Sequence, residues 1–255
     1  MQETRAQETT SKAGRRRLGH VWPAGWWFDG LLLVGFAALT AALAAGWLLD
    51  LDQAVADWVS GHQWDPAYWI TRTLNFLGSG SPLTIICALI AIWLGVRRRS
   101  AWPFALVVAA FLATGFAIMP LKLWTDRAAP RSTLPDAVEI FNHLPAGEYS
   151  LSYPSGHLVN TIVWYGVLAL LLAPWLGRTA RHWLRIAPPT IVFCTTVYLN
   201  FHWVTDSVAG LLLGLLLDRL LTRVPWPALP RPGTSVRASC SRGAGDSASS
   251  PASRA

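Results

Sequence analysis

A histidine and an aspartate stand four residues apart at the start of an apolar stretch and could carry out nucleophilic chemistry. These are His202 and Asp206, which share one face if they lie on one helix. A carboxylate on one ring nitrogen fixes the tautomer and raises the basicity of the other nitrogen, which prepares it for attack. The alternative is a structural hydrogen bond between the two side chains.

A second histidine ends the sequence Tyr-Pro-Ser-Gly-His, directly before another apolar stretch. Pro154 and Gly156 predict a turn, and Ser155 can cap the helix that follows. Backbone N–H groups at a helix start attract an anion. His157 would stand there and could donate a proton to a departing oxygen. The alternative is a turn with a histidine at the membrane interface.

Three cations follow a further apolar stretch within ten residues: Lys122, Arg127 and Arg131. Arginine offers a planar fork of donors and lysine a compact charge, and both suit a phosphate. The alternatives are side chains that reach to the membrane surface, or ion pairs with Asp126 and Asp136.

The elements that must position these residues are membrane helices. Of 255 residues, 53% are hydrophobic and only 14% are charged, which leaves too little charge to cover a soluble domain. The 15 tryptophans suit the membrane–water boundary. The sequence therefore predicts an all-α membrane protein with about six transmembrane helices, near Trp26–Leu49, 82–96, 101–121, 158–176, 187–201 and 204–222.

Residues 21–223 are expected to form one helical membrane domain, with a tail on each side. Residues 1–20 are basic, and residues 224–255 are rich in Ser, Pro, Arg and Gly. Both are expected to be disordered cytoplasmic tails. Residues 50–81 combine acids with aromatic residues, which favours an amphipathic segment on the membrane surface.

The placement of basic residues predicts the orientation. With both termini in the cytoplasm, 17 of the 21 Lys and Arg residues lie inside, as expected of a multi-pass protein of the plasma (inner) membrane. The exceptions are Arg72 and the three cations of the cluster. All three segments then fall on the extracytoplasmic side, where one site could gather them.

The net charge of +7 does not indicate a nucleic-acid partner, because the arginines form short clusters between apolar stretches. The three cysteines have neither metal-site nor disulfide spacing. The sequence gives no signal for an oligomeric state.

Together, the three segments resemble the type 2 phosphatidic acid phosphatase family, which shares its site with vanadium haloperoxidases. Pro154–His157 matches the family element Pro-Ser-Gly-His completely. His202 and Asp206 match the end of the third element. Lys122, Arg127 and Pro130 match much of the first element, a Lys followed by Arg-Pro.

Two positions depart from the family pattern. Ala129 replaces the arginine before the proline, and Thr195 and Thr196 replace a Ser-Arg pair. Two expected phosphate-binding arginines are therefore missing, which predicts weaker activity or a different substrate.

The resemblance implies a helical bundle that cleaves a lipid-linked phosphate monoester or pyrophosphate without metal or cofactor. His202 would attack phosphorus and form a phosphohistidine, Asp206 would stabilise the charged ring, and His157 would protonate the leaving group. The phosphate would be held by Lys122, Arg127, Arg131, Ser155, the Gly156 N–H and Thr196.

Two other functions stay open. A metal-dependent hydrolase would use His143, Glu148, His157, His202 and Asp206, although these lack a H-x-x-x-H spacing. A catalytically weak relative that binds or carries a lipid phosphate is favoured by the missing arginines.

Overall fold

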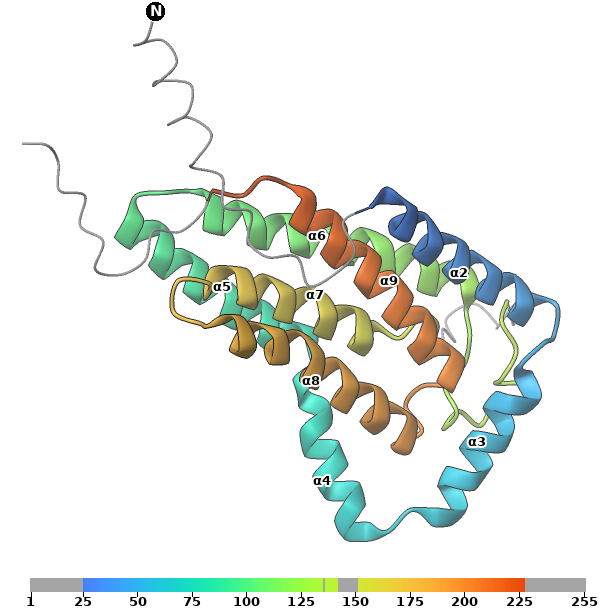
Figure 1. Cartoon of the computed structure of the whole chain (residues 1–255). Coiled ribbons are helices and arrows are strands. Elements are labelled where there is room, and N and C mark those ends of the chain that lie inside the picture. The colour runs from blue at the N-terminus through green and yellow to red at the C-terminus, as the bar shows by residue number, and fades with distance from the viewer. Residues whose placement is uncertain (1–24, 135, 142–150, 228–255) are drawn as a thin grey trace, which may run out of the picture.

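The computed structural model describes residues 25–134, 136–141 and 151–227. Within these ranges the chain is helical and contains no strand, and the long helices lie side by side in one bundle (Figure 1). The predicted tail 1–20 and all but the first residues of the predicted tail 224–255 lie outside the described part of the chain.

Six long helices correspond to the six predicted apolar stretches, which confirms the all-α membrane fold. Two of them, α2 and α9, pack along each other, and so do α5 and α6. Helices α2, α5 and α6 are each long and apolar enough to cross a membrane. The six are α2 (Trp26–Ala44), α5 (Gly80–Arg98), α6 (Trp102–Thr125), α7 (Gly156–Leu171), α8 (Arg178–Tyr198) and α9 (Val204–Arg223).

Helix α8 begins nine residues before the predicted stretch 187–201. Its first turns carry Arg178, Arg181 and Arg185, which an apolar window counts as a loop. Arginine nevertheless has a high helix propensity. Hydropathy thus located the apolar part of this helix but not its start.

Helix α7 is the centre of the bundle and is buried along most of its length. It contacts α5, α6, α8 and α9. Its contact with α9 is close because α9 presents Gly210 and Gly214. A Cβ at Gly210 would lie 2.6 Å from the Ser155 carbonyl oxygen, and one at Gly214 would lie 3.1 Å from the Val159 Cα. Small residues allow such close backbone approach between membrane helices, and here they bring the starts of α7 and α9 together.

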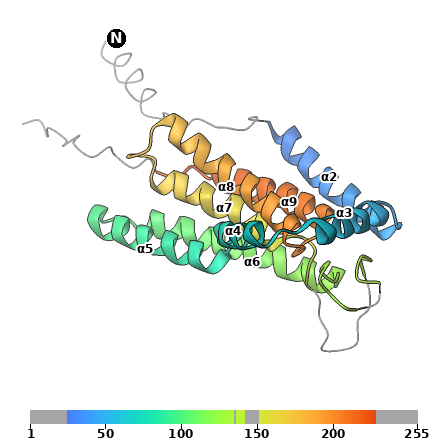
Figure 2. The same cartoon turned by 90° about the horizontal axis from the view of Figure 1, so that it is seen from below.

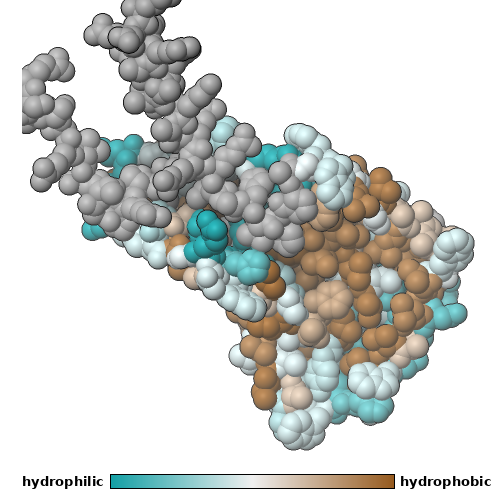
Figure 3. Space-filling model, in the orientation of Figure 1, coloured by the Kyte–Doolittle hydropathy of each residue, from teal (hydrophilic) through white to brown (hydrophobic). Residues whose placement is uncertain are grey.

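The outer surface of the bundle is apolar, as a lipid-facing surface requires. Leu31, Leu33 and Val34 on α2 are more than half exposed, and Phe116 on α6 is 76% exposed. Figure 3 shows hydrophobic residues gathered over much of the visible face of the bundle.

Residues 50–81, expected to form one amphipathic surface segment, contain two helices. Helices α3 (Leu49–His62) and α4 (Asp65–Asn75) project from the bundle as a V, and a short 3-10 helix, η1 (Phe76–Gly78), leads into α5 (Figures 1 and 2). Three tryptophans on this V are more than 60% exposed: Trp58, Trp64 and Trp69. Its position on the membrane surface stays a prediction.

Candidate active site

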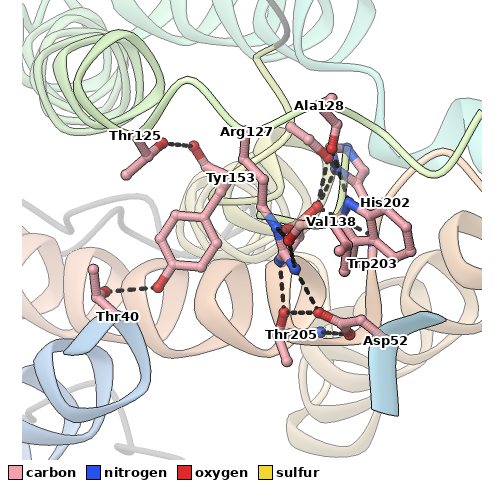
Figure 4. A network of polar contacts seen from close by, with 12 residues as sticks. Thr40, Asp52, Thr125, Arg127, Ala128, Val138, Tyr153, His202, Trp203 and Thr205 are labelled. Carbon is pink, nitrogen blue, oxygen red and sulfur yellow. Dashed lines mark hydrogen bonds and ion pairs between the residues drawn. The ribbon is translucent and has the colours of Figure 1, made fainter. Parts of the chain in front are cut away.

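The three predicted segments meet at one end of the bundle, where α6 ends and α7 and α9 begin. The Ser155 N–H donates to the Asp206 carbonyl oxygen at 3.0 Å, which joins the start of α7 to α9. The Trp203 indole N–H donates to the Ala128 carbonyl oxygen at 2.8 Å, which joins the loop after α6 to the loop before α9 (Figure 4).

Two histidines lie beside each other at this end. The ring centroids of His157 and His202 are 5.6 Å apart, with an edge-to-face angle of 66°. His157 is in the first turn of α7, and His202 lies in the loop between α8 and α9. Gly78 of η1 lies against His157, since a Cβ there would be 3.2 Å from two atoms of that side chain. At this separation both imidazoles can contact one phosphoryl group.

The carboxylate of Asp206 reaches His202 through a third residue, Ser152. The direct distance from His202 Nδ1 to Asp206 Oδ2 is 3.7 Å, which is too long for a hydrogen bond. The Ser152 hydroxyl lies 2.5 Å from Asp206 Oδ2 and 3.2 Å from His202 Nδ1. Because the carboxylate accepts from the hydroxyl, the network assigns the imidazole proton to Nδ1, where it donates to the Ser152 oxygen. The lone pair therefore lies on Nε2.

The surroundings of His202 favour its neutral form. Burial lowers the pKa of this imidazole, and the nearby Asp206 carboxylate opposes part of that shift. A neutral ring with its lone pair on Nε2 is the form that a nucleophile needs.

Arg127 does not have the role that the sequence predicted. Its guanidinium is fully buried, and protein acceptors take all five of its N–H groups. It donates to Asp206 Oδ1 and Asp52 Oδ2 at 2.7 Å each, to the Thr205 hydroxyl at 2.8 Å, and twice to the Val138 carbonyl oxygen. A direct bond to a phosphate is therefore not available, and the arginine instead fixes the Asp206 carboxylate. Figure 4 shows its contacts with Asp52, Val138 and Thr205.

Asp52 of α3 completes this network, and sequence reasoning missed it. It accepts from the Thr205 N–H at 3.0 Å and also from the Thr205 hydroxyl and Arg127. Ser152 was missed as well. Ser152 could have been found from its position directly before the Tyr-Pro-Ser-Gly-His motif. Asp52 lies 75 residues from Arg127 in the sequence, and no motif pointed to it.

Lys122, Ser155 and Gly156 lie close to the histidines. Lys122 Nζ donates to the Leu151 carbonyl oxygen, and its Cε would be 3.6 Å from a Cβ at Gly156. The Ser155 hydroxyl does not make the predicted helix cap. It is buried and has no hydrogen-bond partner among the described residues.

The last two predicted phosphate contacts have other partners. The Thr196 hydroxyl donates to the Val192 carbonyl oxygen of its own helix at 2.8 Å. The Arg131 guanidinium lies over the Phe201 ring, 4.9 Å from its centroid. Arg131 is thus next to the residue that precedes His202.

Two of the five predicted metal ligands, His143 and Glu148, lie outside the described residues. In the ranges that are described, no group of three or more His, Cys, Asp or Glu side chains is arranged to hold a metal ion.

Fold and site together define a helical membrane protein with two imidazoles and a hydrogen-bonded carboxylate at one end of its bundle. The chain belongs to the PAP2 superfamily, whose model matches residues 100–229. It is 26% identical over 191 residues to phosphatidylglycerophosphatase B of Bacillus subtilis (strain 168), covering 73% of this chain and 89% of that protein. It also resembles the crystal structure of a transmembrane PAP2-type phosphatidylglycerolphosphate phosphatase from Bacillus subtilis. The TM-score is 0.63 and the identity 24%, with 76% of this chain and 93% of that one covered.

Proposed function

We propose that the protein is a membrane phosphatase that hydrolyses a lipid-linked phosphate monoester or pyrophosphate through a phosphohistidine. The observation that carries this proposal is the pair of adjacent imidazoles, one of them bound through Ser152 to a buried carboxylate. The PAP2 membership and the phosphatase relatives support the same reaction class.

His202 is the nucleophile in this proposal. Its Nε2 attacks phosphorus in line, and the bond from phosphorus to the leaving oxygen breaks. The ring then carries a positive charge, which Asp206 stabilises through the Ser152 hydroxyl. Arg127 and Asp52 act one step away by holding Asp206 in place.

His157 acts on the oxygen on the other side of the phosphoryl group. It donates a proton to the leaving alcohol or phosphate in the first step. In the second step the neutral ring takes a proton from water, whose oxygen attacks the phosphohistidine. Inorganic phosphate leaves, and His202 returns to its starting state.

Lys122, Ser155 and the Gly156 N–H bind the phosphate oxygens. The Gly156 N–H is at the start of α7, where backbone donors point out of the helix. The unpartnered Ser155 hydroxyl lies beside it. Fixed donors at these positions stabilise charge that develops on the phosphoryl oxygens. Arg131 is the further phosphate ligand, approaching from the side of Phe201.

An open hollow of about 410 Å³ between α5, α6 and α7 favours a lipid substrate. Apolar side chains such as Ile85, Phe111 and Ile118 line it, together with Asn160, which lies one helical turn after His157. An acyl or prenyl chain suits such a surface, with its phosphate at the end near His157.

We place the site on the extracytoplasmic side of the plasma membrane. The end of α5, the start of α8 and the end of α9 lie together at the end of the bundle away from the site (Figure 1). These helix ends carry Arg97 and Arg98, Arg178 and Arg223, respectively. Cationic segments stay in the cytoplasm. A cysteine introduced at Ser132 should therefore react with an impermeant reagent in intact cells, whereas labelling only after lysis would contradict this orientation.

The main test is phosphate release by the purified protein from a diacyl phosphate monoester, a polyprenyl diphosphate and a soluble sugar phosphate, with and without chelator. We expect turnover of a lipid substrate that resists chelation and is abolished in His202→Ala. Retained turnover in His202→Ala would refute the nucleophile. Tight lipid-phosphate binding without turnover would instead identify a carrier of lipid phosphates, the alternative that Ala129 and Thr196 favour.

A second measurement tests the covalent intermediate. In His157→Ala, an aryl phosphate whose leaving group needs no proton should still phosphorylate His202. The second step should be slow, because the variant lacks the imidazole that takes a proton from the attacking water. Acid-labile, base-stable phosphate should therefore accumulate on residue 202. Its absence, with turnover of the aryl phosphate intact, would argue against a phosphohistidine.

A further inference from the structure

Two arginines from different elements converge on one aromatic ring beside the site. The Arg131 guanidinium carbon lies 4.9 Å from the Phe201 ring centroid, and that of Arg72 on α4 lies 5.6 Å from it. Phe201 directly precedes His202. Arg131 also lies 5.5 Å from the Tyr68 ring centroid, and the positive charges of Arg131 and Arg72 lower the pKa of the Tyr68 hydroxyl.

The position of α4 is fixed by hydrogen bonds to the segment that leads to His202. The Thr195 hydroxyl donates to the Asn75 side chain at 3.1 Å, at the end of α4. The Gln63 amide, just before α4, donates to the Tyr198 carbonyl oxygen at 2.8 Å. The Asn200 amide donates to the Ser60 hydroxyl of α3 at 2.8 Å. Arg72 is therefore held next to the loop of His202 by both arms of the V.

The proposed reaction needs more positive charge than the inner site supplies. A phosphate monoester carries close to two negative charges at neutral pH. Arg127 is saturated by protein acceptors, as described above, and Lys122 supplies one charge. Arg72 and Arg131 are both exposed, and neither takes part in an ion pair among the described residues.

We propose that Arg72 and Arg131 form a two-arginine clamp that binds the oxygens of the substrate phosphate from the side of Phe201. The inference rests on the proposed function for its substrate and adds α4, outside the matched family region of residues 100–229, to the binding site. The Phe201 ring holds the two planar guanidinium groups near each other by cation–π contact. Because the side chains are already ordered, they lose less conformational entropy when phosphate binds.

The experiment measures binding of inorganic phosphate to the purified full chain, by thermal stabilisation and by competitive inhibition of turnover. Arg72→Gln and Arg131→Gln should each weaken phosphate binding by roughly tenfold, the effect of one charge-assisted hydrogen bond. Arg72→Lys should fall in between, since it keeps the charge but loses the fork. Arg97→Gln is the matched control, because Arg97 is also an exposed arginine stacked on an aromatic ring, 5.4 Å from Trp93 at the far end of α5.

Phosphate binding by Arg72→Gln equal to that of the wild type would overturn the clamp. So would an equal loss in Arg97→Gln, since the effect would then be net charge alone. A raised KM for lipid with unchanged inhibition by inorganic phosphate would also overturn it, because the arginines would then bind another part of the substrate. Thermal stabilisation does not need turnover, so arginine-dependent phosphate binding without hydrolysis would refute the proposed function and leave the clamp standing.

Discussion

The Ser152 hydroxyl offers the sharpest test of the site, because among the described residues it is the side chain that bonds to both Asp206 and His202. Ser152→Ala deletes one bond of 2.5 Å to the carboxylate and one of 3.2 Å to the imidazole. The direct distance between ring and carboxylate is 3.7 Å, so no hydrogen bond remains after the substitution. The backbone of residue 152 keeps its own bond to the Arg127 carbonyl oxygen at 2.9 Å.

The size of the effect follows from when the charge forms. His202 is neutral in the ground state and becomes positive as phosphorus is attacked, so its bond to Ser152 is charge-assisted only in the transition state. A hydrogen bond to a charged group contributes about 1.5–3 kcal/mol. Since about 1.4 kcal/mol is a tenfold change in rate, kcat should fall roughly 10- to 100-fold, with a smaller change in KM.

The assay is phosphate release in single-turnover and steady-state conditions, compared with Thr40→Val. The Thr40 hydroxyl lies 2.7 Å from the Tyr153 hydroxyl, so this variant also removes a buried hydrogen bond from the same segment but does not touch the histidines. We expect Thr40→Val to lower the unfolding temperature and to leave kcat close to that of the wild type. A Ser152→Ala enzyme within twofold of wild type, or an equal loss of kcat in Thr40→Val, would refute the connecting role of Ser152.

Three further predictions concern the network, the packing and the protonation state. Asp52→Asn breaks a fully buried ion pair and should lower the free energy of unfolding by about 3 kcal/mol, measured by thermal or denaturant unfolding. Gly78→Ala places a Cβ 3.2 Å from two atoms of His157 and 2.8 Å from a Val192 methyl, and should lower kcat about tenfold or more, because the ring must shift. Burial lowers the pKa of His202, so kcat/KM should persist below the ordinary histidine pKa of about 6.5 and fall only as the pH drops through the lowered value.

Each of these three has its own control or contrary result. Asp57 is exposed on the same helix as Asp52, so Asp57→Asn should leave the unfolding free energy within about 0.5 kcal/mol. Gly61 has open space around its Cβ position, and Gly61→Ala should keep full activity. If kcat/KM already fell at a pH above the ordinary histidine pKa, the charge of Asp206 rather than burial would determine the pKa of His202.

The membrane fold could be predicted because it depends on local composition. Apolar stretches of near-spanning length gave the six long helices, and the boundary that differs most is the arginine-rich start of α8. Helices α3 and α4 were harder to predict. Their acids and aromatic residues predicted an amphipathic segment but not its division into two helices, and the positions of these helices depend on distant partners such as Tyr198 and Asn200.

The site was predictable only as far as motif residues go. His157 and His202 belong to separate motifs, and their proximity followed from assigning both to the same end of the bundle. The partners of Arg127 were not predictable. Asp52 approaches it from 75 residues away, and a guanidinium with two carboxylates beside it has no donors left for a substrate.

The sequence by itself determined that this is a helical membrane protein and which residue types could perform phosphoryl transfer. It also singled out four cations that lie outside the segments predicted to be cytoplasmic. These properties depend on composition and spacing along the chain. Only the tertiary structure decided how those cations are used: Arg127 fixes Asp206, while Arg72 and Arg131 share the ring of Phe201. Partner choice among charged side chains depends on which groups are buried within hydrogen-bond distance of one another, and packing of separate helices sets that distance.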